Sequence, residues 1–173
     1  MQLNRLSRWS SYIFMVLVAA LLSCDQTSQD QGTDLRFEIS FPESLSAEPL
    51  TGRMFVCFGE NDERDPRLQV GRYGVQFFGV DFENLAPGET VVIDGSTIGY
   101  PVEWLKDVPA GKYYLQAVLN KYTEFNRSDG HTLWMHNDQW EGQNWRRSPG
   151  NFISEVIEMD IDPAKGGTIK IEL

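Results

Sequence analysis

The residues of this chain that could do chemistry gather in one stretch, from Asp129 to Trp145, which holds both histidines of the chain. His131 and His136 are five positions apart, so they would point to opposite faces of a strand and lie roughly 140° apart on a helix. Only an irregular loop could bring both to one zinc ion, with Asp129 or Asp138 as a further ligand. Histidines that organise the loop through hydrogen bonds are the simpler interpretation. We therefore predict no metal site and no cofactor.

The same stretch holds three of the five tryptophans, set among polar residues and followed by two arginines. Trp and Arg are enriched at the energetic centres of protein interfaces, and Trp presents a large apolar ring that a chain tends to bury. Three interpretations stay open: a structural cover over the end of a sandwich, a protein interface, and a glycan site. The candidate binding residues are Trp134, Trp140, Trp145, His131, His136 and Arg146. We expect this stretch to be ordered and to carry the partner-facing surface.

No complete catalytic motif appears in the sequence. Acyl transfer on a strand-to-helix turn uses Gly-x-Ser-x-Gly, but Ser96 stands in the wrong frame between Gly95 and Gly99. Ser148 has a following glycine, while Arg146 occupies the first glycine position. We predict no catalytic residue in this chain.

The N-terminus has the pattern of a targeting signal. Two arginines precede an uncharged apolar run of 11 residues, 12–22, which is too short to span a bilayer, since that takes about 20 residues. The run ends in Leu21-Leu22-Ser23-Cys24, which resembles the lipobox of bacterial lipoproteins, although Leu22 is larger than the residues common at that place. The resemblance implies a signal peptide over residues 1–23 and a lipid anchor on Cys24. An ordinary cleaved signal or a membrane anchor is the alternative.

The lipobox resemblance implies that the protein is lipid-anchored in the bacterial cell envelope, on the periplasmic or surface side. Residues 24–34 are polar and predict a flexible tether. Without the two arginines of the signal, 13 basic residues remain against 25 acidic ones, a net charge of −12. This balance argues against nucleic acid as a partner. Cys57 would be the only cysteine besides the lipidated one, so we predict no internal disulfide and a buried, unreactive thiol.

Alternating apolar and polar residues predict the fold. The clearest strand follows the turn at Pro109-Ala110-Gly111 and runs to Asn120, apolar on both faces as in the centre of a sandwich. After Lys121 the pattern breaks, which predicts a long loop or a short irregular hairpin. Further strands are expected at 35–41, 52–60, 75–82, 90–93, 155–161 and 168–173, with no amphipathic helix. The sequence therefore predicts an all-β protein, an antiparallel immunoglobulin-like β-sandwich over residues 35–173.

Three segments carry a resemblance to a known family: Val108 to Tyr122, Asp129 to Trp134, and Glu141 to Asn151. They resemble the N-terminal β-sandwich region of secreted bacterial proteins that carry an esterase-like domain of α/β-hydrolase type further on. The resemblance implies an accessory domain or a fragment of a longer gene product, and it transfers no catalytic residue, because this sequence has no nucleophile-bearing domain. The expected function is a non-catalytic accessory or interaction domain of a lipid-anchored envelope protein, with the membrane and a hydrolase domain as partners. The alternative is a stand-alone glycan-binding module that uses the Trp-rich loop.

Overall fold

The computed structural model describes residues 34–137 and 144–173. The described residues belong to one compact unit. The predicted signal peptide, the lipidation residue Cys24 and the candidate binding residue Trp140 lie outside the described residues. Within the described ranges, no helix is long and apolar enough to cross a membrane.

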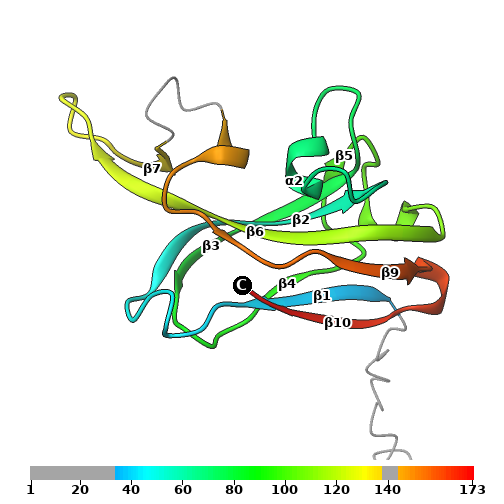
Figure 1. The fold of residues 1–173 in the computed structure, drawn as a ribbon. Coiled ribbons are helices and arrows are strands. Elements are labelled where there is room, and N and C mark those ends of the chain that lie inside the picture. The colour runs from blue at the N-terminus through cyan, green and yellow to red at the C-terminus, as the bar shows by residue number, and fades with distance from the viewer. Residues whose placement is uncertain (1–33, 138–143) are drawn as a thin grey trace, which may run out of the picture. The chain divides into compact units, whose positions relative to one another are not determined.

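Strands make up most of the fold (Figure 1). They are β1 (Leu35–Ser40), β2 (Leu50–Gly59), β3 (Phe77–Leu85), β4 (Val91–Ile93), β5 (Gly99–Tyr100), β6 (Gly111–Asn126), β7 (Thr132–His136), β8 (Phe152–Ile153), β9 (Ile157–Ile161) and β10 (Gly167–Glu172). The helical segments are single turns: α2 (Pro66–Gln69), η1 (Leu105–Asp107), η2 (Trp145–Arg147) and η3 (Pro163–Lys165).

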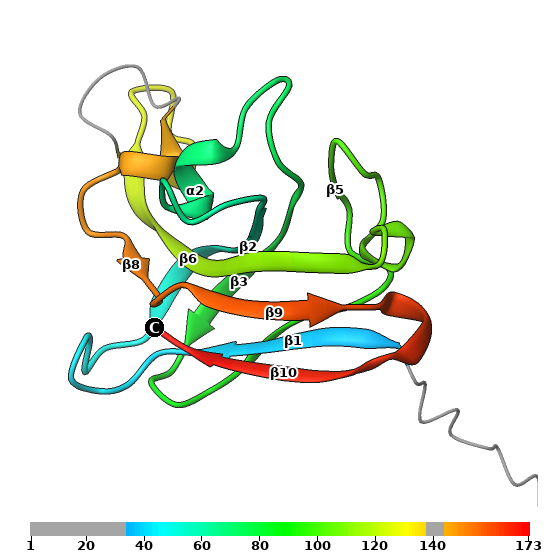
Figure 2. The same ribbon diagram turned by 45° about the vertical axis from the view of Figure 1, so that its right-hand side comes forward.

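The strands form two packed sheets, which confirms the prediction of an all-β sandwich. The small sheet has the order β10-β1-β4, and the large sheet has the order β5-β3-β2-β6-β7 with β8 and β9 also paired to β6. Figure 2 shows β9 running beside β6 while β1 and β10 lie together below it. One pairing departs from the antiparallel expectation: β1 and β10 are parallel, from Leu35↔Gly167 to Ser40↔Glu172. The first and last described strands are therefore neighbours.

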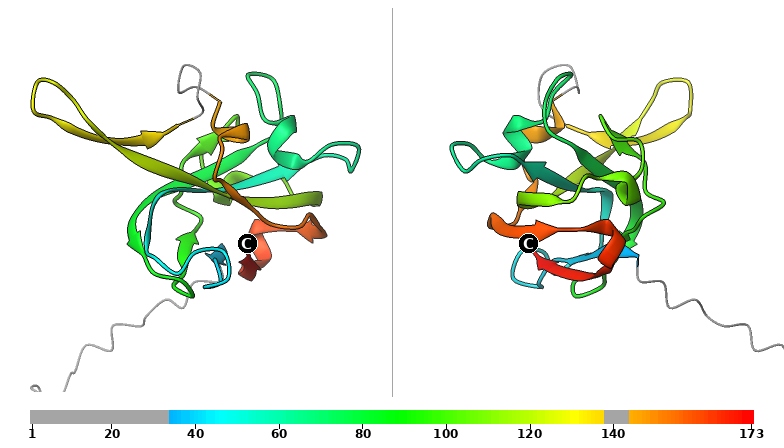
Figure 3. Two further views of the ribbon diagram at one scale, coloured as in Figure 1. Left: turned by 60° about the vertical axis from the view of Figure 1, so that its left-hand side comes forward. Right: turned by 90° about the vertical axis from the view of Figure 1, so that its right-hand side faces the viewer.

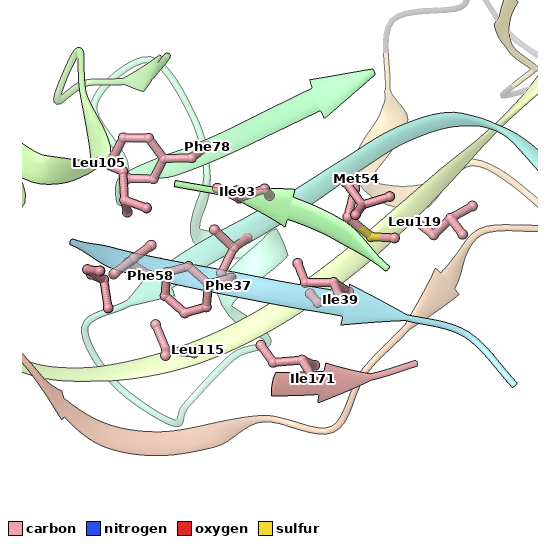
Figure 4. Packing of buried hydrophobic residues seen from close by; sticks show 14 of the residues in the cluster. Phe37, Ile39, Met54, Phe58, Phe78, Ile93, Leu105, Leu115, Leu119 and Ile171 are labelled. Carbon is pink, nitrogen blue, oxygen red and sulfur yellow. The ribbon is translucent and has the colours of Figure 1, made fainter. Parts of the chain in front are cut away.

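The main core fills the space between the two sheets. Side chains alternate along a strand, so β1 directs Phe37 and Ile39 inward and β6 directs Leu115 and Leu119 toward them (Figure 4). Phe37 meets Phe58 of β2 edge to face, with ring centroids 5.7 Å apart. Aromatic pairs prefer this geometry. The alternation that predicted these strands thus also positions the core.

A second, smaller cluster lies on the far side of the large sheet. We call this side the outer face; it is formed by Arg53, Phe55 and Cys57 of β2 together with Val118 and Asn120 of β6. Over its centre pack Val70, Val75 and Trp145, from α2's C-terminal cap, the loop that follows and η2. This double coverage explains why β2 and the first part of β6 are apolar on both faces.

The alternation of apolar and polar residues did not predict where β6 ends. The strand does not stop near Lys121 but continues to Asn126, and β7 pairs with it in unbroken register from Tyr122↔His136 to Asn126↔Thr132. The predicted long loop over this part is therefore wrong, and the alternative of a hairpin is right except that its ladder is regular. The polar residues that broke the apolar pattern lie on a hairpin that the core does not cover, so no burial imposes an apolar face on it.

Candidate functional site

The hairpin of residues 122–136, which we call the arm, extends away from the sandwich (Figure 1, and Figure 3, left). Its turn closes where the Arg127 amide donates to the His131 carbonyl at 2.9 Å. Gly130 takes a φ of 84°, which glycine adopts without steric cost. Asp129 fixes the turn further, because its carboxylate accepts the His131 amide at 3.2 Å and pairs with the Arg127 guanidinium at 2.9 Å. Local chemistry therefore suffices to form the tip.

One face of the arm carries a row of exposed apolar side chains. Phe125 lies directly across from Leu133, and Met135 is the next residue of β7 on that face. Their exposed fractions are 36%, 42% and 42%. By alternation this face continues the side of β6 that holds Leu119 in the core, but it extends past the small sheet. We call these three residues the apolar row.

The opposite face of the arm carries Trp134, which is 50% exposed, and Tyr122 paired across from His136. The Tyr122 hydroxyl donates to an Asp81 carboxylate oxygen at 3.0 Å, and Arg53 holds the other oxygen of Asp81 at 3.1 Å. Burial, and then the Asp81 charge, raise the pKa of Tyr122 above its ordinary value. This network fastens the base of the arm to β2 and β3, while Trp134 extends beyond it.

Two polar atoms near the base of the arm are buried without a hydrogen-bond partner among the described residues. They are Oδ1 of Asn120, a residue that is 2% exposed, and Nε2 of His136. Asn120 precedes Tyr122 by two positions and shares its face, so it lies diagonal to His136 across the ladder. Buried polar atoms normally find a partner in protein, water or ligand. The base of the arm thus holds two buried polar atoms without a described partner, and His136 is two residues from exposed Trp134 on the same face.

Trp145 and Arg146, two of the predicted binding residues, hold η2 on the outer face. The Trp145 ring stacks on Phe55 and also packs against Phe77. The Arg146 guanidinium donates to the Val70 carbonyl, and the Arg146 carbonyl accepts from the Arg67 guanidinium. For these two residues the contacts agree with the structural-cover interpretation, and a binding role stays a prediction.

The two histidines do not converge on one site. His131 lies at the exposed tip of the arm and His136 at its half-buried base. Five residues of extended strand separate them by roughly 16 Å, and no group of three or more His, Cys, Asp or Glu within the described ranges could hold a metal ion.

Four side chains of types that can serve as nucleophiles or as acids and bases, Cys57, Ser96, Ser148 and Glu158, have structural contacts. Cys57 is fully buried, and this burial raises the pKa of its thiol far above the ordinary range despite the neighbouring Arg67. The Ser96 hydroxyl donates to Asp94 at 2.7 Å, and the buried Ser148 hydroxyl donates to the Asn144 carbonyl at 3.2 Å. Glu158 forms an exposed ion pair with Lys112 at 2.5 Å. The two serine hydroxyls thus stabilise turns, and the Lys112–Glu158 pair lies on a solvent-exposed strand face.

The structure therefore divides the predicted site into an arm with Trp134, His131 and His136 and a structural cover with Trp145 and Arg146. Sequence reasoning missed the apolar row, Phe125, Leu133 and Met135. A signal was present: Thr132 to His136 reads Thr-Leu-Trp-Met-His, five residues with no charge at pH 7, beside the turn signal Asp129-Gly130.

No protein-family model, no curated protein and no solved structure matches this chain, so its function has to be inferred from the chemistry of the arm and of the outer face.

Proposed function

We propose that this chain is a non-catalytic interaction domain of a lipid-anchored envelope protein and that the arm is its partner-binding element. One observation carries the proposal: four large apolar side chains, those of the apolar row and Trp134, are exposed together on a hairpin outside the core. A hairpin of two strands is marginally stable on its own, and exposed large apolar side chains that gather on one element are typical of an interaction site.

A protein domain is the partner that fits this surface best. The apolar row and Trp134 lie on opposite faces of a two-stranded ribbon, so a partner with a cleft can receive both faces at once. Aromatic and methionine side chains are enriched in the buried centre of interfaces. The hydrolase domain implied by the family resemblance is such a partner, and a non-catalytic role agrees with the structural tasks of Cys57, Ser96 and Ser148.

The anchoring part of the proposal concerns Cys24, with residues 1–23 as its signal peptide and the bacterial envelope as its location. Labelling cells with a tagged fatty acid tests it: the native protein should take up label and sediment with membranes, whereas Cys24→Ser should do neither. Native protein without label, retained on membranes to the same extent as the variant, would refute the lipid anchor.

Photo-cross-linking in intact cells tests the arm. A photoreactive residue placed at Leu133 should form an adduct with one partner protein, and the same residue at Ile98 serves as the control. Ile98 is also exposed and apolar, at 61%, but lies next to β5. Adducts from both positions in equal yield, or from neither, would contradict the proposal.

A glycan-binding module is the second candidate function. The specific observation behind it is exposed Trp134 two residues from His136 on one face, where the buried Nε2 of His136 has no hydrogen-bond partner among the described residues. Calorimetric titration with envelope polysaccharides separates the two candidates. Glycan binding that Trp134→Ala abolishes and Leu133→Ser preserves would favour the glycan module over the protein interface.

A further inference from the structure

Beyond a partner of different sequence, we propose that β7 is a docking strand for a second copy of this chain. The two β7 strands pair antiparallel about a two-fold axis that passes between their Trp134 residues. This inference uses the arm of the proposed function but names a different occupant, so each can fail without the other.

The first step is that β7 is an unprotected edge. Among the described residues β7 ends the large sheet, and its five residues include no proline, no glycine and no charge at pH 7. Natural proteins blunt exposed edges with charges, proline or bulges, because an open edge is a template for strand addition. The edge strand β10, in contrast, carries Lys170 and Glu172. The edge of β7, five uncharged residues in unbroken register with β6, can therefore accept a further strand.

The second step is the direction of the main-chain groups. In an antiparallel ladder, alternate residues exchange hydrogen bonds with the neighbouring strand. Arg127 and His131 form a hydrogen-bonded pair at the turn. Counting every second residue from His131, the N–H and C=O groups of Leu133 and Met135 therefore point toward β6 and bond to it. Thr132, Trp134 and His136 then present their N–H and C=O groups to the open side. Trp134 is the middle one of these three, which makes the edge complementary to itself.

The third step is the register that this symmetry selects. Centred on Trp134, the pairing places Thr132 opposite His136 of the second copy and Leu133 opposite Met135 of the second copy. Apolar side chains then meet across the new strand pair, and the apolar rows of both copies join into one face. A slip by one residue would set outward groups against inward ones, so the edge hydrogen bonds could not form. A slip by two residues restores the match but pairs only two of the three outward-facing residues of each copy, so the register centred on Trp134 forms the most edge hydrogen bonds.

The fourth step is charge. Behind the signal the chain carries a net charge of −12, which opposes self-association in general. The arm carries little net charge. Its charged residues, within 122–136, are Glu124, Arg127 and Asp129, and the last two form an ion pair. No like charges stand opposite each other in the proposed register. Repulsion between the acidic sandwiches is screened beyond about 8 Å at physiological salt, so the association should not weaken as salt is raised.

Sedimentation velocity of the mature chain carrying Cys24→Ser tests the proposal. We expect a reversible dimer whose dissociation constant is unchanged or lower in 0.5 M than in 0.05 M NaCl. Thr132→Pro and His136→Pro remove outward-facing amides while leaving the bonds of β7 to β6 in place, so each should raise the dissociation constant at least tenfold. Thr132→Ala and His136→Ala are the matched controls, and circular dichroism melts verify that all four variants fold.

Disulfide trapping tests the register. Oxidation of the Trp134→Cys variant should give a covalent dimer, because directly opposed residues of a bonded pair lie about 5.5 Å apart between Cα atoms, within disulfide reach. Thr132→Cys should not, because the two substituted positions would be four residues apart along the ribbon, about 13 Å. A monomer at all concentrations, a dimer indifferent to both proline variants, or equal trapping at both positions would overturn the inference. A monomer that still cross-links to a different protein through Leu133 would overturn it and leave the proposed function standing.

Discussion

The Trp145 ring lies nearly parallel to the Phe55 ring, with centroids 4.0 Å apart and an interplanar angle of 18°. Phe55 belongs to the outer face at the centre of the large sheet, so this stack closes the second apolar cluster. Trp145→Ala should therefore lower the free energy of unfolding by about 3 kcal/mol, at the low end of the range for Trp and Phe truncations because the ring is partly exposed. Chemical denaturation measures this value directly.

Trp134→Ala is the matched control for that prediction. The Trp134 side chain is half exposed on the arm, so its loss should change the free energy of unfolding by no more than about 0.5 kcal/mol. Equal destabilisation by the two substitutions would show that both tryptophans belong to the fold and would remove Trp134 from the proposed interface.

Ser154→Ala should destabilise the protein more than the small change in volume suggests. The Ser154 hydroxyl accepts the Ala117 amide at 2.9 Å, and Ala117 is fully buried in β6. Removal of the hydroxyl leaves the buried Ala117 amide without a hydrogen-bond acceptor, which lowers the free energy of unfolding by about 1–3 kcal/mol. Urea unfolding of Ser154→Ala should show this loss, while Ser96→Ala, at an exposed turn, should stay near the native value. A loss of less than about 0.5 kcal/mol, the usual size of the effect of a surface substitution, would mean that another group accepts the hydrogen bond of the Ala117 amide.

Cys57 should be unreactive in the folded protein at any pH that leaves the fold intact. In the Cys24→Ser variant it is the sole thiol, and burial raises its pKa far above the ordinary range. A thiol reagent should label Cys57 only after denaturation, and labelling of the folded protein should not accelerate from about pH 7 to about pH 9, the range around an ordinary thiol pKa. Ser96→Cys in a Cys57→Ala background provides an exposed thiol for comparison. Fast labelling of folded Cys57 would show that the outer face opens readily.

The Lys112–Glu158 ion pair predicts a measurable titration shift. The hydrogen bond from Lys112 lowers the pKa of Glu158 below its ordinary value of 4.5. A carboxyl with a lowered folded-state pKa contributes stability above its unfolded pKa and loses it as pH falls through the folded one. Both groups are exposed, so NMR of the carboxyl carbon is a better readout than stability. The titration midpoint of Glu158 should move up in Lys112→Met and stay in place in Lys165→Met; no upward movement would mean that the pair does not form in solution.

The fold could be predicted from the sequence wherever a strand faces the core. Phe37 and Ile39 in β1, and Leu115 and Leu119 in β6, alternate because burial on one side demands it. The arm lacks this constraint, so its polar residues resembled a loop. Trp134 and Trp145 are the same residue type in the same stretch, and only their tertiary neighbours distinguish an exposed ring from a structural one. Those neighbours, Phe55 and Phe77, lie far away in the chain and leave no local pattern.

The parallel pairing of β1 with β10 sets the order in which this protein can be completed during its synthesis. β1 is made first and β10 last, yet Phe37 lies beside Ile169 and Ile39 beside Ile171 in the finished sheet. A nascent chain that stops short of residue 167 has one side of β1 unpaired, and closure of so long a segment is slow compared with local hairpins. The arm and its neighbours in the large sheet can assemble earlier. Until β10 has been made, the newly synthesised domain therefore exposes one edge of β1 and the apolar side chains beside it, a state that is prone to aggregation.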